Sequence, residues 1–341
     1  MKILLILTGG TITMVRNATT GALHPADLET FKAFVPELFA SDIQVTMLPF
    51  SPLVDSSDVQ PSDWQRMARA VYDNYADYDG FVVLHGTDTM SYSASALSFM
   101  LENLGKPVVF TGSQLPVGVL RSDAKENLLT AIEIAAAKRE NGEAMVPEVS
   151  VFFEGTLFRA NRTTKKNAEH FEAFDSYNYP SLAKAGVHIT YRTNLIATPK
   201  NAPLRLHEQL CQNVALLKLF PGITEPVVEA ILTTPNLRGV VLETYGAGNA
   251  PSSDWLYQQL HRAVERGVVV VNKTQCSTGS VEMGKYEVSL NLLKAGVLSG
   301  FDITTEALLT KMMLLLGEFP NDIDKVKQLL QTSLFGEITT E

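Results

Sequence analysis

Short apolar runs alternate with longer segments of helical periodicity along most of the chain. Because strands buried on both faces read as continuous apolar runs, this alternation predicts an α/β fold with a mostly parallel sheet flanked by helices. The predicted strands are Ile3–Leu7, Val45–Leu48, Phe81–Leu84, Val108–Phe110, Val149–Phe153, Val187–Thr190, Val214–Leu219, Val240–Leu242 and Val268–Val271.

The helical segments carry start and stop signals. Pro61 begins one helix at the position where the missing N–H of proline costs nothing. Another ends before Gly105-Lys106-Pro107, where glycine permits a left-handed cap and proline cannot continue the helix. The predicted helices are Pro61–Tyr75, Met90–Glu102, Asp123–Ala137, Val227–Leu232, Trp255–Glu265, Glu306–Leu316 and Ile323–Leu330.

Periodicity disappears in the polar, proline-containing segment Arg192 to Glu208, which we predict to be a linker. A chain of 341 residues is long enough for two domains of common size. We therefore expect a larger N-terminal domain over 1–191 with a mostly parallel, mixed sheet that carries the site. After the linker at 192–208, a smaller Rossmann-like α/β domain is expected over 209–341.

Composition and charge narrow the class of protein. Hydrophobic residues make up 45% and charged residues 19%, as in ordinary globular proteins. The net charge of −9, without a long basic run, argues against nucleic-acid binding. Two cysteines, Cys211 and Cys276, exclude a disulfide framework and fit a reducing compartment.

The apolar start of the chain is a strand in our interpretation, not a targeting signal. Ile3–Leu7 is shorter than the roughly 7–15 apolar residues of a signal-peptide core, and glycines follow it directly. No stretch approaches the roughly 18 apolar residues of a membrane span. We therefore expect a cytoplasmic protein that does not associate with membranes.

Glycine and hydroxyl residues follow nearly every predicted strand. Open α/β sheets bind ligands at the carboxyl ends of their strands, so these loops are expected to converge on one crevice. Hydroxyls and free backbone N–H groups suit a small, oxygen-rich ligand. The loops read TGGT, HGTDT, TGSQ, EGT, ETYGAGN and NKTQCSTGS.

Several reaction types lack their motifs. Both nucleotide fingerprints, G-x-x-x-x-G-K-[ST] and G-x-G-x-x-G after the first strand, are missing. The nucleophile elbow G-x-S-x-G is absent, and the histidines show no metal-ligand spacing, so we expect no metal. His85, a single histidine before Gly86, is more typical of a structural residue than of a metal ligand.

Threonine remains as a candidate nucleophile, and it needs a base or a cation nearby. In HGTDT, Thr87 stands beside Asp88, and Lys165 and Lys166 lie in a long aperiodic segment. Less specific interpretations stay open for each residue. Thr11 and Thr87 are compatible with turn hydrogen bonds, Asp88 with a helix N-cap, and the lysines with solvated surface charges. Asp55 to Asp58 is compatible with an ordinary loop.

Taken together, these motifs resemble the bacterial type I, or cytoplasmic, L-asparaginases. The resemblance spans almost the whole chain, and TGGT and HGTDT at this separation form a specific pair. It is carried by LTGGTI, SPLVDSSD, DGFVVLHGTDTMSYSASALSFMLENLGKPVVFTGSQ, RSDAKENLL, NRTTK, YGAGNAP and VVVNKTQC.

The resemblance implies hydrolysis of L-asparagine to L-aspartate and ammonia without a cofactor. It implies that Thr11 is the nucleophile, which forms a β-acyl-enzyme. Thr87 and Lys165 would handle the proton and the attacking water, and Asp88 would bind the α-ammonium of the substrate. Asp55 and Ser56 match the substrate-binding Asp-Ser pair of the family. Family members are commonly dimers or dimers of dimers, so the resemblance implies a homo-oligomer such as a homotetramer.

Two positions depart from the family pattern. Ala22 follows Gly21 in the loop after the first strand, where members usually carry a tyrosine that contacts the nucleophile. Glu243 stands where some members have an arginine of an allosteric asparagine site between subunits. Because a carboxylate there would repel the carboxylate of asparagine, we expect this allosteric site to be absent.

The sequence leaves three alternative functions open. A broader amidase would also use L-glutamine, at least weakly, because one methylene is worth only about 1–3 kcal/mol of discrimination. The asparaginase-like subunit of a tRNA-dependent amidotransferase normally has an extra domain before the TGGT strand, and TGGT here starts at residue 8. A binding protein that has lost turnover would be stabilised by asparagine without releasing ammonia.

Overall fold

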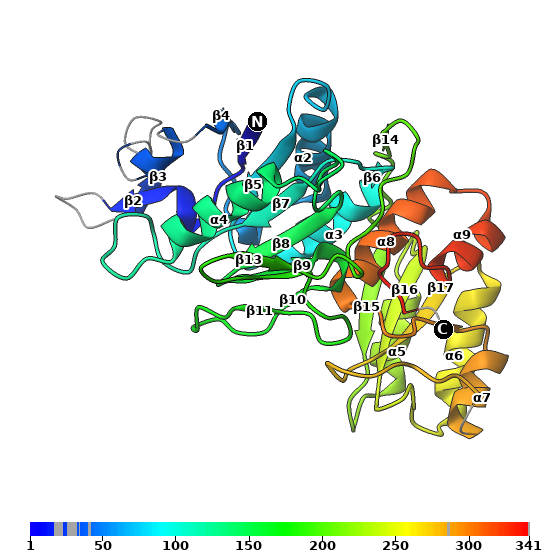
Figure 1. The fold of residues 1–341 in the computed structure, drawn as a ribbon. Coiled ribbons are helices and arrows are strands. Elements are labelled where there is room, and N and C mark those ends of the chain that lie inside the picture. The colour runs from blue at the N-terminus through cyan, green and yellow to red at the C-terminus, as the bar shows by residue number, and fades with distance from the viewer. Residues whose placement is uncertain (17–22, 26–32, 34, 40–41, 285–286, 340–341) are drawn as a thin grey trace. The chain divides into compact units, whose positions relative to one another are not determined.

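The computed structural model describes residues 1–16, 23–25, 33, 35–39, 42–284 and 287–339 (Figure 1). The chain forms two compact units, Met1–Leu206 and His207–Glu341. The division falls within 192–208, but this segment is not entirely irregular. Its residues Arg205–Leu206 form β14, which pairs antiparallel with β6 (Leu101–Glu102). The domain boundaries 1–191 and 209–341 stay a prediction.

The first unit is built on an eight-stranded mixed sheet in the order β13-β12-β9-β8-β7-β5-β1-β4. Five strands are parallel: β1 (Lys2–Leu7), β4 (Gln44–Pro49), β5 (Gly80–Leu84), β7 (Val108–Thr111) and β8 (Val149–Phe153). Three antiparallel strands extend it: β9 (Thr156–Arg159), β12 (Ala183–Ala185) and β13 (Ile189–Tyr191). The predicted α/β sheet is thus confirmed as mainly parallel and mixed.

Helices cover the central strands (Figure 1). On one face, Ile3 and Leu5 of β1 share a core with Leu128 and Ala131 of α4 (Ala124–Ala136). On the other side, α2 (Pro61–Asp73) packs against α3 (Met90–Met100), which contacts β8. Burying each large aliphatic side chain contributes about 1.5–3 kcal/mol, which is why strands apolar on both faces stay in the sheet centre.

The start of α2 shows how local sequence sets an element. Gln60 and Asp63 form a capping box, in which the backbone N–H of Gln60 donates to Asp63 Oδ2 at 3.0 Å. Pro61 occupies the first turn, as its fixed φ favours. These contacts satisfy N–H groups that have no partner inside the helix.

The second unit holds a four-stranded parallel sheet in the order β15-β16-β17-β18. Its strands are β15 (Val214–Lys218), β16 (Gly239–Thr244), β17 (Val269–Thr274) and β18 (Leu298–Ser299). The helices are α5 (Glu225–Leu232), α6 (Asp254–Glu265), α7 (Glu287–Lys294), α8 (Thr305–Glu318) and α9 (Ile323–Leu330). This smaller α/β unit matches the predicted class.

Some predicted bounds are wrong. The helix expected over Met90–Glu102 ends at Met100, because Leu101 becomes extended and pairs with Leu206. The left-handed residue after it is Asn103, with φ 64°, and not Gly105. The strand expected over Val187–Thr190 is β13, which begins two residues later.

Short elements complete the structure. They are β2 (Met14–Arg16) paired with β3 (Leu23–Pro25), β10 (Thr164–Lys165) paired with β11 (Phe174–Asp175), and the 3-10 helices Thr11–Thr13, Pro36–Phe39, Ser56–Asp58 and Ala160–Arg162. In the part of the chain that the structure describes, no helix has the length and apolarity needed to cross a membrane.

Candidate functional site

Three loops meet at the carboxyl ends of β4, β1 and β5, which are adjacent parallel strands. The loop after β1 starts with Thr8, whose hydroxyl donates to the Leu84 carbonyl oxygen at 2.8 Å. The Val54 N–H donates to the Thr8 carbonyl oxygen, also at 2.8 Å, so the loop after β4 is held to the same segment. The TGGT, DSSD and HGTDT motifs therefore lie together, as parallel strands require.

Glycine lets these loops approach at van der Waals distance. A Cβ on Gly10 would lie 2.3 Å from the amide nitrogen of Gly86, and Gly10 has a φ of +84°. A Cβ on Gly86 would lie 2.4 Å from Ser56 Oγ. Gly86 is thus enclosed between the loop after β1 and the loop after β4. Any side chain at Gly10 or Gly86 would push the loops apart.

Thr11 and Thr87 each directly follow one of these two glycines. Thr11 is half-buried and begins a 3-10 turn. That turn is closed by Thr13, whose hydroxyl donates to the Gly10 carbonyl oxygen at 2.9 Å. Two of the predicted threonines therefore belong to loops whose backbones are in contact.

Lys165 contacts two of the predicted residues at once. Its Nζ donates to Thr87 Oγ1 at 2.8 Å and to Asp88 Oδ1 at 2.6 Å. The Lys165 side chain is 17% exposed and that of Asp88 is 64% exposed, so the carboxylate can still reach a ligand. The N-cap of α3 is Thr89 and not Asp88, which removes the simple capping interpretation.

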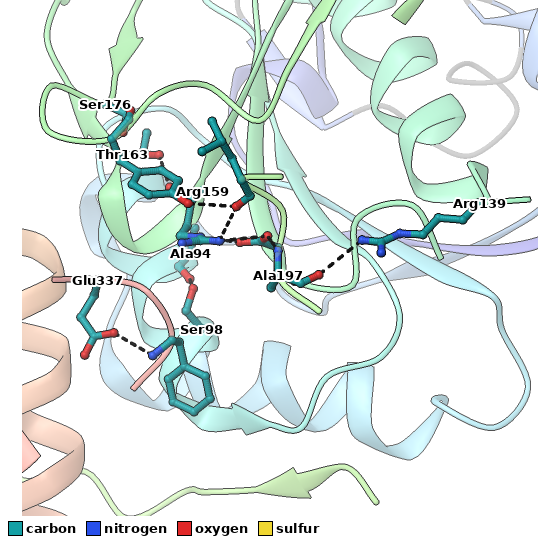
Figure 2. A network of polar contacts seen from close by, with 12 residues as sticks. Ala94, Ser98, Arg139, Arg159, Thr163, Ser176, Ala197 and Glu337 are labelled. Atoms are coloured by element: carbon teal, nitrogen blue, oxygen red, sulfur yellow. Dashed lines mark hydrogen bonds and ion pairs between the residues drawn. The ribbon is translucent and has the colours of Figure 1, made fainter. Parts of the chain in front are cut away.

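A network of polar contacts that includes Arg159 and Thr163 lies in the segment before Lys165 (Figure 2). Arg159, at the end of β9, forms an ion pair with Glu148 at 2.7 Å. The Thr163 hydroxyl donates to the Arg159 carbonyl oxygen at 2.7 Å, which fixes the turn two residues before Lys165. On β10, Lys165 lies opposite Phe174 of β11. The turn before Lys165 is thus tied to the end of β9, and Lys165 itself is held by pairing with β11.

Gln114 is a further site residue that the sequence motifs did not single out. The Thr87 hydroxyl donates to Gln114 Oε1 at 3.2 Å, and Gln114 Nε2 donates to the His170 carbonyl oxygen at 3.0 Å. The backbone N–H of Gln114 is held by Asp123 Oδ2 at 2.9 Å. The available signal was its place in TGSQ, a loop at the carboxyl end of β7, which we grouped with the others without singling out the glutamine.

The Asp55-Ser56 pair is divided between surface and interior. Asp55 is exposed, and its carboxylate accepts hydrogen bonds from the Ser57 N–H at 2.9 Å and the Ser57 hydroxyl at 2.8 Å. These bonds, the backbone one first, lower the pKa of Asp55, so it is negative at neutral pH. Ser56 is buried, and its carbonyl oxygen accepts from the Thr89 hydroxyl at 2.6 Å.

The arrangement combines two hydroxyl groups, one ammonium and two exposed carboxylates at the end of a parallel sheet. Such a set can bind a small cation-bearing substrate and move protons between a threonine and a lysine. Within the described residues, no group of three or more His, Cys, Asp or Glu side chains could hold a metal ion. Ala22, the position of the missing tyrosine, lies outside the described residues.

Comparisons with known proteins cover both units. A family model described as "Asparaginase, N-terminal" matches residues 2–197, and "Glutaminase/Asparaginase C-terminal domain" matches residues 213–330. L-asparaginase 1 of Escherichia coli K12 is 44% identical over 335 residues, which are 98% of this chain and 97% of that protein.

Two solved structures are similar over their whole length. L-asparaginase I of Vibrio cholerae has a TM-score of 0.89 and 42% identity, with 99% of each chain covered. The thermostable L-asparaginase of Thermococcus kodakarensis has a TM-score of 0.91 and 33% identity, with 100% of each chain covered.

Proposed function

We propose that this chain, which belongs to the asparaginase family, hydrolyses the side-chain amide of L-asparagine to L-aspartate and ammonia. The observation that carries the proposal is the position of Lys165, within hydrogen-bond distance of both Thr87 and Asp88 beside the TGGT loop. This set offers a nucleophilic hydroxyl from the loop after β1, a carboxylate for the substrate ammonium from the loop after β5, and a proton carrier from β10.

In the first step, Thr11 Oγ1 attacks the side-chain amide carbon of asparagine. The C–N bond breaks, the nitrogen takes up a proton and leaves as ammonia, and Thr11 is left as a β-aspartyl ester. In the second step, water attacks the ester carbon, aspartate is released and the Thr11 hydroxyl is restored. Thr87 and Lys165 carry the protons that these two attacks release.

Asp88 connects substrate binding to Lys165. In the free protein, the carboxylate of Asp88 accepts a hydrogen bond from Lys165 Nζ. The α-ammonium of asparagine competes with Lys165 for this carboxylate. Binding of the substrate to Asp88 therefore leaves Lys165 Nζ to the Thr87 hydroxyl, which it already contacts at 2.8 Å.

Backbone N–H groups of the TGGT loop are suited to the negative charge that develops on the carbonyl oxygen during attack. Glycines at 9 and 10 leave the backbone uncovered by side chains, and such preorganised donors are worth about 3–4 kcal/mol in other acyl-transfer sites. Asp55, negative and at the same edge of the sheet, contributes a second carboxylate for the ammonium end of the substrate.

The test is ammonia release from L-asparagine and from L-glutamine, measured over a wide concentration range. We expect release from asparagine, weaker release from glutamine, loss with Thr11→Ala and partial retention with Thr11→Ser. Thr233→Ala removes an exposed hydroxyl in the second unit and serves as the control. A protein that asparagine stabilises against heat without releasing ammonia would be a binding protein, and the proposal would be wrong.

We also propose, from the resemblance, a cytoplasmic location and a homo-oligomer that is a dimer or a dimer of dimers. Cys211 and Cys276 are free thiols, which fits a reducing compartment. Light scattering on the purified chain should give a multiple of 37.3 kDa. A monomer at assay concentration would contradict the assembly.

A further inference from the structure

We propose that His85 is a positioning residue that orients the Gly86–Thr87 peptide unit for the reaction, through the hydrogen on its Nδ1 atom. This inference rests on the proposed function, because its main readout is turnover of asparagine. His85 directly follows β5 and is 1% exposed, so it does not reach the substrate itself.

The hydrogen-bond partners of His85 determine its tautomer. Nδ1 lies 2.7 Å from the carbonyl oxygen of Gly86, and a carbonyl oxygen can only accept. Nδ1 therefore carries the hydrogen. Nε2 lies 2.9 Å from Ser93 Oγ, and in the neutral ring it must accept the Ser93 hydrogen.

Ser93 is itself oriented by a further donor. The indole Nε1 of Trp64 donates to Ser93 Oγ at 3.0 Å, so the serine oxygen accepts from Trp64 and sends its hydrogen to His85. Ser93 is fully buried and Trp64 is 6% exposed. The chain of bonds runs in one direction, from α2 through α3 to the loop after β5, and every polar atom of it has a partner.

Burial keeps the imidazole ring of His85 in one protonation state. It lowers the pKa of His85 from 6.5 to about 4, against the opposing effects of the Gly86 carbonyl and the Asp63 carboxylate. At neutral pH the ring is therefore uncharged, as the hydrogen bond from Ser93 to Nε2 requires.

Gly86 is where orientation is needed. Glycine has the greatest backbone freedom of any residue, and the Gly86 carbonyl belongs to the same planar peptide unit as the Thr87 N–H. Fixing the carbonyl oxygen from one side therefore fixes the direction of that N–H and the start of Thr87. Gly10 and Ser56 limit the position of Gly86. The hydrogen bond from His85 then fixes the rotation of the Gly86–Thr87 peptide plane.

The sharpest test compares two variants of nearly equal polarity. In His85→Asn, the amide nitrogen can take the place of Nδ1 and donate to the Gly86 carbonyl oxygen. In His85→Gln, the longer side chain places its amide near Ser93, so the Gly86 carbonyl oxygen is left without a donor. We expect kcat for asparagine to fall about tenfold at most in the first and about a hundredfold in the second, with similar KM. Leu334→Ala, in the second unit, is the control for handling and stability.

If His85 only stabilised the fold, the two variants would not differ in kcat in the expected order. Equal losses in the two variants, or a larger loss in His85→Asn, would overturn the proposal. The ¹⁵N chemical shifts of the His85 ring in the unaltered protein give a second readout that is independent of catalysis. A hydrogen on Nδ1 is expected, and a hydrogen on Nε2 would overturn the proposal even where a variant fails to fold. Absence of turnover in the unaltered protein would instead overturn the proposed function.

Discussion

Lys165 Nζ and Asp88 Oδ1 lie 2.6 Å apart although 77 residues separate them in the chain. One belongs to a two-residue strand outside the main sheet, and the other to the loop after β5. Such a contact between a partly buried cation and an exposed carboxylate is available for exchange with a charged ligand.

Lys165→Met should lower kcat for asparagine by about 10²–10⁴, the range of general acid–base contributions. Lys166→Met is a matched control, because Lys166 is the next residue and also forms an ion pair, with Asp175 at 2.9 Å. Steady-state ammonia release measures both. Comparable losses of kcat in the two variants would show that replacing either lysine disturbs the segment around β10, and that Lys165 is not a proton carrier.

Gln114→Leu should lower kcat about tenfold, because the Thr87 hydroxyl loses the acceptor that orients it. The same substitution made in a Thr87→Val protein should have no further effect, since Gln114 would act through Thr87. The four proteins form a double-mutant cycle in kcat/KM. Additive losses would mean that Gln114 acts elsewhere.

His85 should make stability depend on pH between about 4 and 6.5. Its folded pKa of about 4 lies below the unfolded value, so the unfolded chain binds more protons in this window and stability rises with pH. The neutral His85 ring contributes about 3 kcal/mol to the free energy of unfolding. This contribution is present above pH 6.5 and is lost as the pH falls to about 4. Denaturant unfolding of the unaltered protein and His85→Asn at several pH values measures it. A stability difference that does not change with pH would contradict it.

The rate of ammonia release should depend hyperbolically on asparagine concentration. Glu243 is buried in the second unit, where Oε1 accepts from the Thr305 hydroxyl at 2.6 Å and Oε2 lies 3.4 Å from Lys218 Nζ. A carboxylate in this position repels the carboxylate of a second asparagine. We expect a Hill coefficient of about 1. A sigmoidal curve that Glu243→Gln abolishes would contradict this.

Lys311→Met should destabilise the protein by about 3–5 kcal/mol, because it leaves the fully buried Glu337 without its partner at 2.7 Å. Adding Glu337→Gln should recover part of the loss. The exposed pair of Lys125 and Glu37 is the control, and Lys125→Met should leave the stability almost unchanged. Denaturant midpoints measure all three, and equal effects for the two lysines would contradict the argument.

Much of the parallel framework could be predicted from the sequence. β1, β5 and β7 are apolar on both faces, and their contacts with α4 depend on local periodicity that can be counted along the chain. The loops after β1 and β5 could be placed together for the same reason, because the carboxyl ends of neighbouring parallel strands share an edge.

Elements stabilised by distant partners could not be predicted. β6 exists because Leu101 pairs with Leu206, and nothing in the local pattern distinguishes it from the end of a helix. The same holds for β10, where Lys165 pairs with Phe174. The TGSQ loop could be placed near the site, but nothing in it distinguishes Gln114 from its neighbours until its hydrogen bond with Thr87 is seen. The roles of Thr11, Thr87, Asp88, Lys165, Asp55 and Ser56 stay predictions.

The close approach of Gly10 to Gly86 has a consequence for how the protein can change over generations. The backbones of the two loops touch here with no side chain between them. Replacing either glycine by alanine, which one base change can do, adds a methyl group for which there is no room. Residues around the pair can vary one at a time, whereas the pair cannot. We expect adaptation to new amide substrates to proceed through changes in the surrounding side chains, while Gly10 and Gly86 stay glycine.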